Sequence, residues 1–130
     1  MNFKKTIISM AMAFSLMLGL SACGDNTQNL QKSADLIFAQ YKEHPPSRGW
    51  KVLSVHPDAK NNKLLVQILV TAQQDVNKLK SISRMDQLVV AKISCPKASK
   101  ELSASLGSDT RIWIELRTNH TSLITSLCPK

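Results

Sequence analysis

The feature that most limits the fold of this chain of 130 residues is an apolar segment at its start. Lys4 and Lys5 precede an apolar run over 7–20, which is too short and too asymmetrically flanked to be kept as a spanning helix. This pattern is typical of a secretory signal peptide, which we predict over 1–22. About a hundred residues then remain, enough for one small domain over 30–130 that buries about two thirds of its surface.

Residues 20–23, Leu-Ser-Ala-Cys, with Gly24 following, resemble the lipobox of bacterial lipoproteins at every position. The resemblance implies cleavage before Cys23, a diacylglycerol thioether on its sulfur and usually a third chain on the freed amine. The alternative is an ordinary secretory signal with a chance cysteine. Two or three acyl chains hold a protein on a membrane, whereas one anchors it only marginally. Gly24 in place of Asp implies sorting to the periplasmic face of the outer membrane, although Asp25 leaves retention at the inner membrane open.

The charge of the exported chain narrows its partners. The signal contains two of the 17 Lys and Arg residues and none of the nine Asp and Glu residues, so the mature chain has a net charge of +6. Export excludes nucleic acid as a partner in practice. Anionic lipid head groups, an acidic protein segment or a merely soluble basic surface remain as explanations.

The cysteines predict one disulfide. With Cys23 lipidated, Cys95 and Cys128 are an even pair in an oxidising compartment, and two cysteines alone make a poor metal site. Their α-carbons are expected within about 7 Å of each other. Closing the loop between them would stabilise the fold by roughly 3–4 kcal/mol in the chain-entropy model.

The first half of the mature chain predicts a tether, a helix and a hairpin. Residues 24–29 are polar and lack periodicity, which favours a tether over 23–29 between lipid and domain. Apolar spacings of three and four predict a helix over 28–42. Strands are expected over 50–56 and 64–71, around a turn at 57–62. The apolar face of the helix contains Leu30, Ala34, Ile37, Phe38 and Tyr41.

The second half predicts two helices and two strands. Asp75 or Ser81 is expected to cap a helix that ends near Cys95. A short helix over 98–106 ends at Gly107, a typical C-cap residue. Strands follow over 111–118 and 121–127. The order α-β-β-α-α-β-β predicts an α+β fold with a small antiparallel sheet of about four strands and helices on one face. The expected buried side of the longer helix is Met85, Leu88, Val89 and Ile93.

No catalytic motif occurs in the chain. The histidines His44, His56 and His120 are scattered and are expected in exposed loops or at strand ends. The carboxylates occur singly among lysines, so no pair is set up for acid–base chemistry. We therefore expect a protein that is not an enzyme and that uses no metal or cofactor.

The second face of the sheet is the candidate binding surface. If the even-numbered strand residues face the helices, Leu65, Leu69 and Trp113 point away from them, where polar residues are usual. Exposed leucine and tryptophan mark interfaces. The alternative is that another helix or the C-terminal segment covers this face as ordinary core. The expected polar rim is Gln67, Arg111, Glu115 and Arg117.

The order of these features resembles the α/β class of type II secretion pilotins. A lipobox, a tether, an amphipathic helix, Gly49-Trp50 before a hairpin, a helix ending in Cys95 and the near-terminal Cys128 all match that layout. The resemblance implies a non-catalytic lipoprotein that binds the C-terminal segment of an outer-membrane secretin and escorts it. The alternatives are an accessory lipoprotein of a conjugation or type IV secretion apparatus and a lipid-binding envelope protein.

Overall fold

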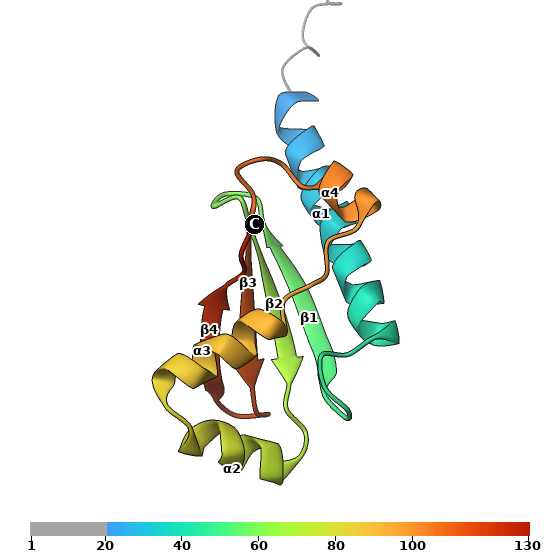
Figure 1. Cartoon of the computed structure of the whole chain (residues 1–130). Coiled ribbons are helices and arrows are strands. Elements are labelled where there is room, and N and C mark those ends of the chain that lie inside the picture. The colour runs from blue at the N-terminus through green and yellow to red at the C-terminus, as the bar shows by residue number, and fades with distance from the viewer. Residues whose placement is uncertain (1–20) are drawn as a thin grey trace, which may run out of the picture.

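The computed structural model describes residues 21–130, with side chains from Asn26 onward. The predicted signal peptide lies outside the described residues except for its last two positions, and so does the Cys23 side chain that carries the predicted lipidation. Four helices and four strands make up the described chain (Figure 1). In chain order they are α1 (Ser21–Glu43), β1 (Lys51–Asp58), β2 (Lys63–Leu69), α2 (Gln73–Ser81), α3 (Arg84–Ile93), α4 (Lys100–Ser105), β3 (Arg111–Arg117) and β4 (Ser122–Leu127).

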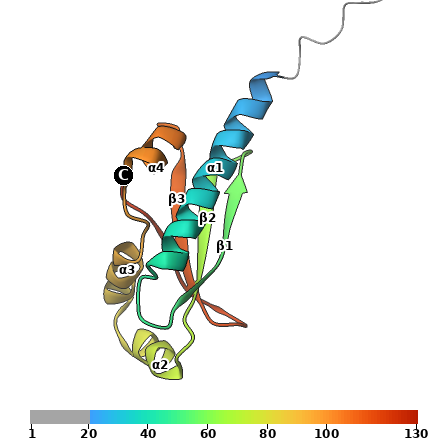
Figure 2. The same ribbon diagram turned by 90° about the vertical axis from the view of Figure 1, so that its right-hand side faces the viewer.

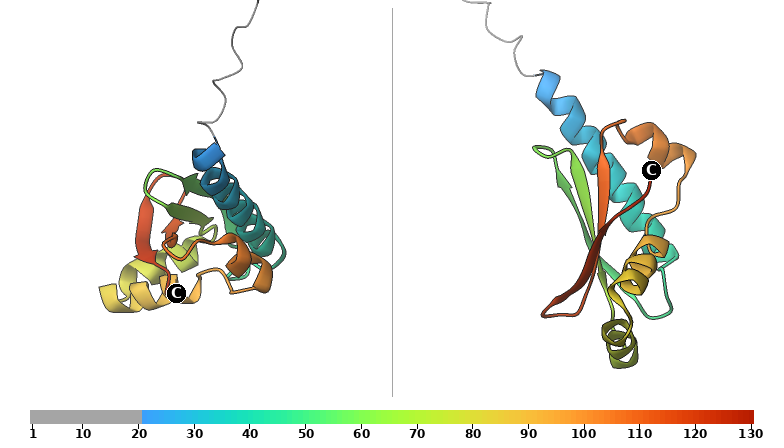
Figure 3. Two further views of the ribbon diagram at one scale, coloured as in Figure 1. Left: turned by 90° about the horizontal axis from the view of Figure 1, so that it is seen from above. Right: turned by 60° about the vertical axis from the view of Figure 1, so that its left-hand side comes forward.

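The predicted α+β class is confirmed, but the sheet is mixed and not wholly antiparallel. Its strand order is β1-β2-β3-β4, and the two hairpins β1–β2 and β3–β4 are antiparallel. The central pair, β2 and β3, is parallel, with Leu65 beside Trp113. Three helices connect these two strands and return the chain to the end at which β2 begins, which is the connection that a parallel pair requires. Helices α1, α3 and α4 lie on one face of the sheet, as predicted, and α2 lies at the lower end of the sheet (Figures 2 and 3).

The core lies between that face and the helices, and strand alternation predicts it correctly. Leu64, Val66 and Ile68 of β2 are fully buried, and Ile114 and Leu116 of β3 lie beside them, also fully buried. Successive strand residues point to opposite faces, so the intervening residues lie on the side away from the helices. Alternation in the sequence therefore determines which side of each central strand is core.

Helix α1 begins earlier than predicted. Residues 24–29, expected as a tether without regular structure, continue the helix from Ser21. Residues 26–29 are exposed, and Leu30 is the first buried side chain. Of the five residues predicted on its apolar face, four are buried, whereas Phe38 is 36% exposed.

The single long helix predicted after β2 is two helices. Residues 82–83 are extended, and Ser83 caps α3 by accepting a hydrogen bond on its hydroxyl oxygen from the Asp86 amide at 3.1 Å. Neither Asp75 nor Ser81 is the cap: Ala72 precedes α2, and Asp75 lies within its first turn. A serine at the N-cap satisfies an amide that has no partner inside the helix, which is why the new helix starts there.

The predicted buried side of α3 is wrong for three of its four residues. Met85, Val89 and Ile93 are 71%, 51% and 77% exposed, while Leu88 is half-buried and Ala91 is fully buried. The apolar residues of α3 spread over a wide arc of the helix, and only the part with Leu88 and Ala91 turns toward the sheet, where α3 packs on β3 and β4. Periodicity alone does not decide which part of such an arc is covered.

The predicted disulfide is confirmed. Cys95, two residues beyond α3, is bonded to Cys128, immediately after β4, and their α-carbons are 5.8 Å apart. The bond joins the helical connection to the last strand. The short helix α4 follows, capped by the Ser99 hydroxyl, and it ends before Gly107 as expected.

Candidate partner-binding surface

The open face of the sheet carries the residues that the sequence singles out. Leu65, Trp113 and Leu127 lie side by side on β2, β3 and β4, and they form what we call the Trp113 patch. Leu65 and Trp113 are half-buried, and Leu127 is 37% exposed. An apolar row on a sheet face without a second layer is unusual, because such faces ordinarily alternate to polar residues.

Nothing in the described chain covers this face. The helices pack on the opposite side, with α1 against β1 and β2 and α3 against β3 and β4. After Cys128 the chain turns toward α4, where the Lys130 ammonium donates to the Ser108 carbonyl at 2.6 Å (Figure 3). Within residues 21–130, the alternative of a covered face is therefore wrong.

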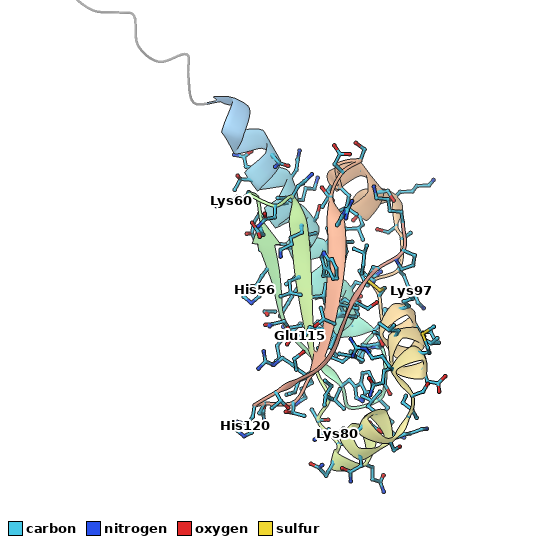
Figure 4. The ribbon with its side chains drawn as sticks, turned by 90° about the vertical axis from the view of Figure 1, so that its left-hand side faces the viewer. His56, Lys60, Lys80, Lys97, Glu115 and His120 are labelled. Carbon is cyan, nitrogen blue, oxygen red and sulfur yellow. A yellow bond between two sulfur atoms is a disulfide. The ribbon has the colours of Figure 1, made fainter. Side chains whose placement is uncertain are left out.

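A chain of hydrogen bonds crosses the centre of the same face. The Ser54 hydroxyl donates to Gln67 Oε1 at 2.8 Å and, its hydrogen thus used, accepts from His56 Nε2 at 2.9 Å. Gln67 Nε2 donates to Glu115 Oε2 at 3.0 Å, and Arg117 lies 3.5 Å from Glu115 Oε1. Glu115 is only 9% exposed, and these donors compensate its burial. Figure 4 shows His56 and Glu115 on the sheet, with α1 behind it.

This polar row shows that the open face of the sheet does not have the expected arrangement of an apolar centre with a polar rim. Gln67 and Glu115 lie in the middle of the face, between the row of Leu65 and Trp113 and the row that contains Leu69. Leu69 pairs with Arg117 and lines a separate, mostly polar hollow beside the β3–β4 turn. The structure thus brings Leu65 and Trp113 together and leaves Leu69 apart from them.

Two hollows meet the Trp113 patch. A shallow one of about 310 Å³ lies over Leu65 and Trp113. A larger one of about 480 Å³, the α4 groove, lies where the sheet edge meets α4, and Leu127 borders it. Apolar side chains of α4, of its C-cap and of the two last strands line the α4 groove, together with two cations. These side chains are Leu102, Leu106, Ile112 and Leu127, and the cations are Arg111 and Lys130.

The α4 groove is the part of the surface that sequence reasoning missed. Leu102 and Leu106 belong to a helix that the sequence predicts, and Leu127 belongs to a predicted strand. Their spacing contains no signal that they converge, because the groove forms between α4 and the end of β4, which are distant in the sequence. Alternation along β4 could have placed Leu127 on the open face with Trp113.

Apolar side chains make up the Trp113 patch and most of the wall of the α4 groove. His56 is committed to Ser54, and within residues 26–130 no three His, Cys, Asp or Glu side chains gather as a metal site would require. None of the helices described is both long and apolar enough to cross a membrane. Protein interfaces commonly combine an apolar centre with a polar or charged rim.

Comparison with known proteins adds no relative: no protein-family model, no curated protein and no solved structure matches this chain.

Proposed function

We propose that this protein is a non-catalytic, pilotin-like lipoprotein that binds the C-terminal segment of an outer-membrane secretin. In this proposal Cys23 carries the lipid, the protein resides on the periplasmic face of the outer membrane, and the secretin segment is carried there with it. The observation that supports the proposal most directly is the uncovered Trp113 patch, which continues at Leu127 into the α4 groove.

The geometry suits a short amphipathic helix as the occupant. Such a helix binds by laying an apolar stripe of residues three and four apart into a groove. The α4 groove has an apolar wall from Leu102 and Leu106, and Trp113 stands beyond Leu127 on the adjoining strand. The polar row of Gln67 and Glu115 limits the apolar surface on its other side, which favours a segment only a few turns long.

The test is binding of a synthetic peptide that carries the C-terminal segment of the secretin encoded in the same genome, measured by titration calorimetry. We expect Trp113→Ala to weaken binding by about 2 kcal/mol, or roughly thirtyfold, because buried tryptophans dominate interfaces of this kind. Its thermal melt should stay close to that of the wild type, since Trp113 is not part of the buried core.

The matched control is Val89→Ala, which truncates an exposed apolar side chain on the helical side of the molecule. It should bind the secretin peptide as the wild type does. Wild-type protein that shows no binding would refute the secretin as partner. Unchanged affinity in Trp113→Ala with a collapsed melting temperature would show that Trp113 serves the fold alone.

A further inference from the structure

The outer side of α3 is a second unpartnered apolar surface, remote from the Trp113 patch. Met85, Val89 and Ile93 follow one another at intervals of four, so their side chains form one ridge along the helix. We call these three residues the α3 ridge. Single exposed apolar residues are ordinary on protein surfaces, but a contiguous run of three is a mark of interaction.

The α3 ridge borders a preformed groove. A hollow of about 270 Å³ lies between α2, α3 and the loop before β1, and Ile93 belongs to both the ridge and this hollow. Trp50 forms part of its wall and is held in place because its indole N–H donates to Asp75 Oδ2 at 2.8 Å. The other apolar lining residues are Pro46, Leu79, Ile82 and Val90.

Unpaired positive charge lies along the helices that form this groove: Lys78 lines the groove itself, and four further cations lie in α2 and α3 or shortly after them. The segment 73–97 contains five cations and two anions, and both anions have internal partners: Asp75 accepts from Trp50, and Asp86 accepts from the Ser83 hydroxyl at 2.8 Å. In the described part of the chain, none of the five cationic side chains forms an ion pair or a hydrogen bond. Figure 4 shows Lys80 on α2 and Lys97 beyond α3, on either side of that helix. The five are Lys78, Lys80, Arg84, Lys92 and Lys97.

We propose that the α3 ridge and its groove bind an acidic amphipathic segment of a partner protein, at a site separate from the one that receives the secretin segment. The apolar stripe of this segment covers Met85, Val89 and Ile93, and its flanking carboxylates face the free lysines and Arg84. Complementary charge of this kind speeds association and selects the partner more than it adds affinity. The proposal does not depend on the secretin, because no residue is shared between the two sites.

The position of α3 favours a protein segment over a lipid surface. The first turn of α1, which contains Cys23, and helix α2 lie at opposite ends of the molecule, and α3 lies beside α2 (Figures 1 and 2). Helix α1 is 23 residues long, which corresponds to about 35 Å. A membrane that holds the chain at Cys23 is therefore far from the α3 ridge.

The experiment uses the two tryptophans of the chain as separate reporters. In full-length protein with Trp113→Phe, Trp50 is the one remaining indole, and it lines the groove beside the α3 ridge. The probe is a synthetic helical peptide with leucine on one side and glutamate on the other. Its matched control has lysine in place of every glutamate. We expect the acidic peptide to change Trp50 emission saturably, with an affinity that falls as salt rises, and the basic peptide to have no effect.

Substitution on the ridge tests the contact itself. Met85→Ser combined with Val89→Ser should weaken binding of the acidic peptide at least about tenfold. These side chains are exposed, so the thermal melt should stay unchanged. Leu53→Ser, the same kind of change at an exposed leucine of β1, should bind as the parent protein does.

Four results would overturn the proposal. They are equal binding of the two peptides, full binding by the doubly substituted ridge, binding of anionic phosphatidylglycerol vesicles in place of the acidic peptide, and a dimer that dissociates on the same double substitution. The secretin peptide should leave Trp50 emission unchanged, so failure of the acidic peptide to bind is distinguishable from failure of the proposed function.

Discussion

Removal of the Cys95–Cys128 disulfide is the most informative test of how this fold is held together. The bond spans a separation of 33 residues, and the entropy that it removes from the unfolded chain corresponds to between about 3 and 4 kcal/mol at 25 °C. Small domains are stable by only about 5–15 kcal/mol, so this one bond is a large share of the total. A domain of this size loses about 3–6 °C in melting temperature per kcal/mol, so Cys95→Ser should melt about 10–20 °C lower.

The assay is thermal unfolding followed by far-ultraviolet circular dichroism, with and without a thiol reductant. Reductant should lower the melting temperature of the wild type to nearly that of Cys95→Ser and should leave the variant unchanged. The fold should survive at room temperature, because the core between sheet and helices contains many buried residues besides Cys128, and Cys95 only packs against it. A variant that melts within about 3 °C of the oxidised wild type would refute the entropic reasoning. Two free thiols in mass spectra of protein from the periplasm would refute the bond.

Three further changes test other parts of the molecule. Cys23→Ser should abolish palmitate labelling and leave the precursor uncleaved, and normal labelling of this variant would contradict the lipoprotein assignment. Burial raises the pKa of Tyr41, whose hydroxyl donates to the Ser94 carbonyl at 2.6 Å. Tyr41→Phe leaves that carbonyl without its partner and should lower the free energy of unfolding in urea by about 1–3 kcal/mol. An unchanged urea midpoint would show that this hydrogen bond does not stabilise the fold. Hydrogen bonds from Asn61 hold the pKa of Asp58 below its ordinary value of 3.8. A carboxyl group with a lowered pKa stabilises the fold above its unfolded pKa and not below it, so Asp58→Asn should reduce stability at neutral pH and match the wild type in acid. An equal loss of stability at all pH values would show that the Asn61 hydrogen bonds to the carboxylate are not the cause.

The sequence identifies the buried side of the two central strands because every position on that side is apolar, whereas the other side mixes apolar and polar residues. In β2 the residues Leu64, Val66 and Ile68 are apolar and lie on one side of the strand. That side is buried whether the neighbouring strand runs parallel or antiparallel to β2. Direction of pairing is a different matter. Hairpin turns force neighbours to be antiparallel, but β2 and β3 are separated by three helices, and only the path of those helices makes the pair parallel.

The buried side of α3 cannot be predicted from the pattern of apolar residues. Met85, Val89 and Ile93 are as regular a stripe as Leu88 and Ala91, so amphipathicity favours neither side. The choice depends on packing against β3 and β4, which the local sequence does not contain. The candidate surface shows the same division: alternation places Trp113 on the open face, but the α4 groove beside it forms between segments that are distant in the sequence.

The early start of α1 has a mechanical consequence for any anchor at Cys23. Residues 21–29 continue the helix without a break before Leu30, the first buried side chain, so about two and a half turns, or roughly 13 Å, project beyond the domain as a helical stalk. A flexible tether would let the domain tumble over the bilayer, whereas a stalk fixes its height and limits its tilt. The Trp113 patch and the α3 ridge, on different sides of the molecule, would then face constant directions and be presented to two neighbours at once.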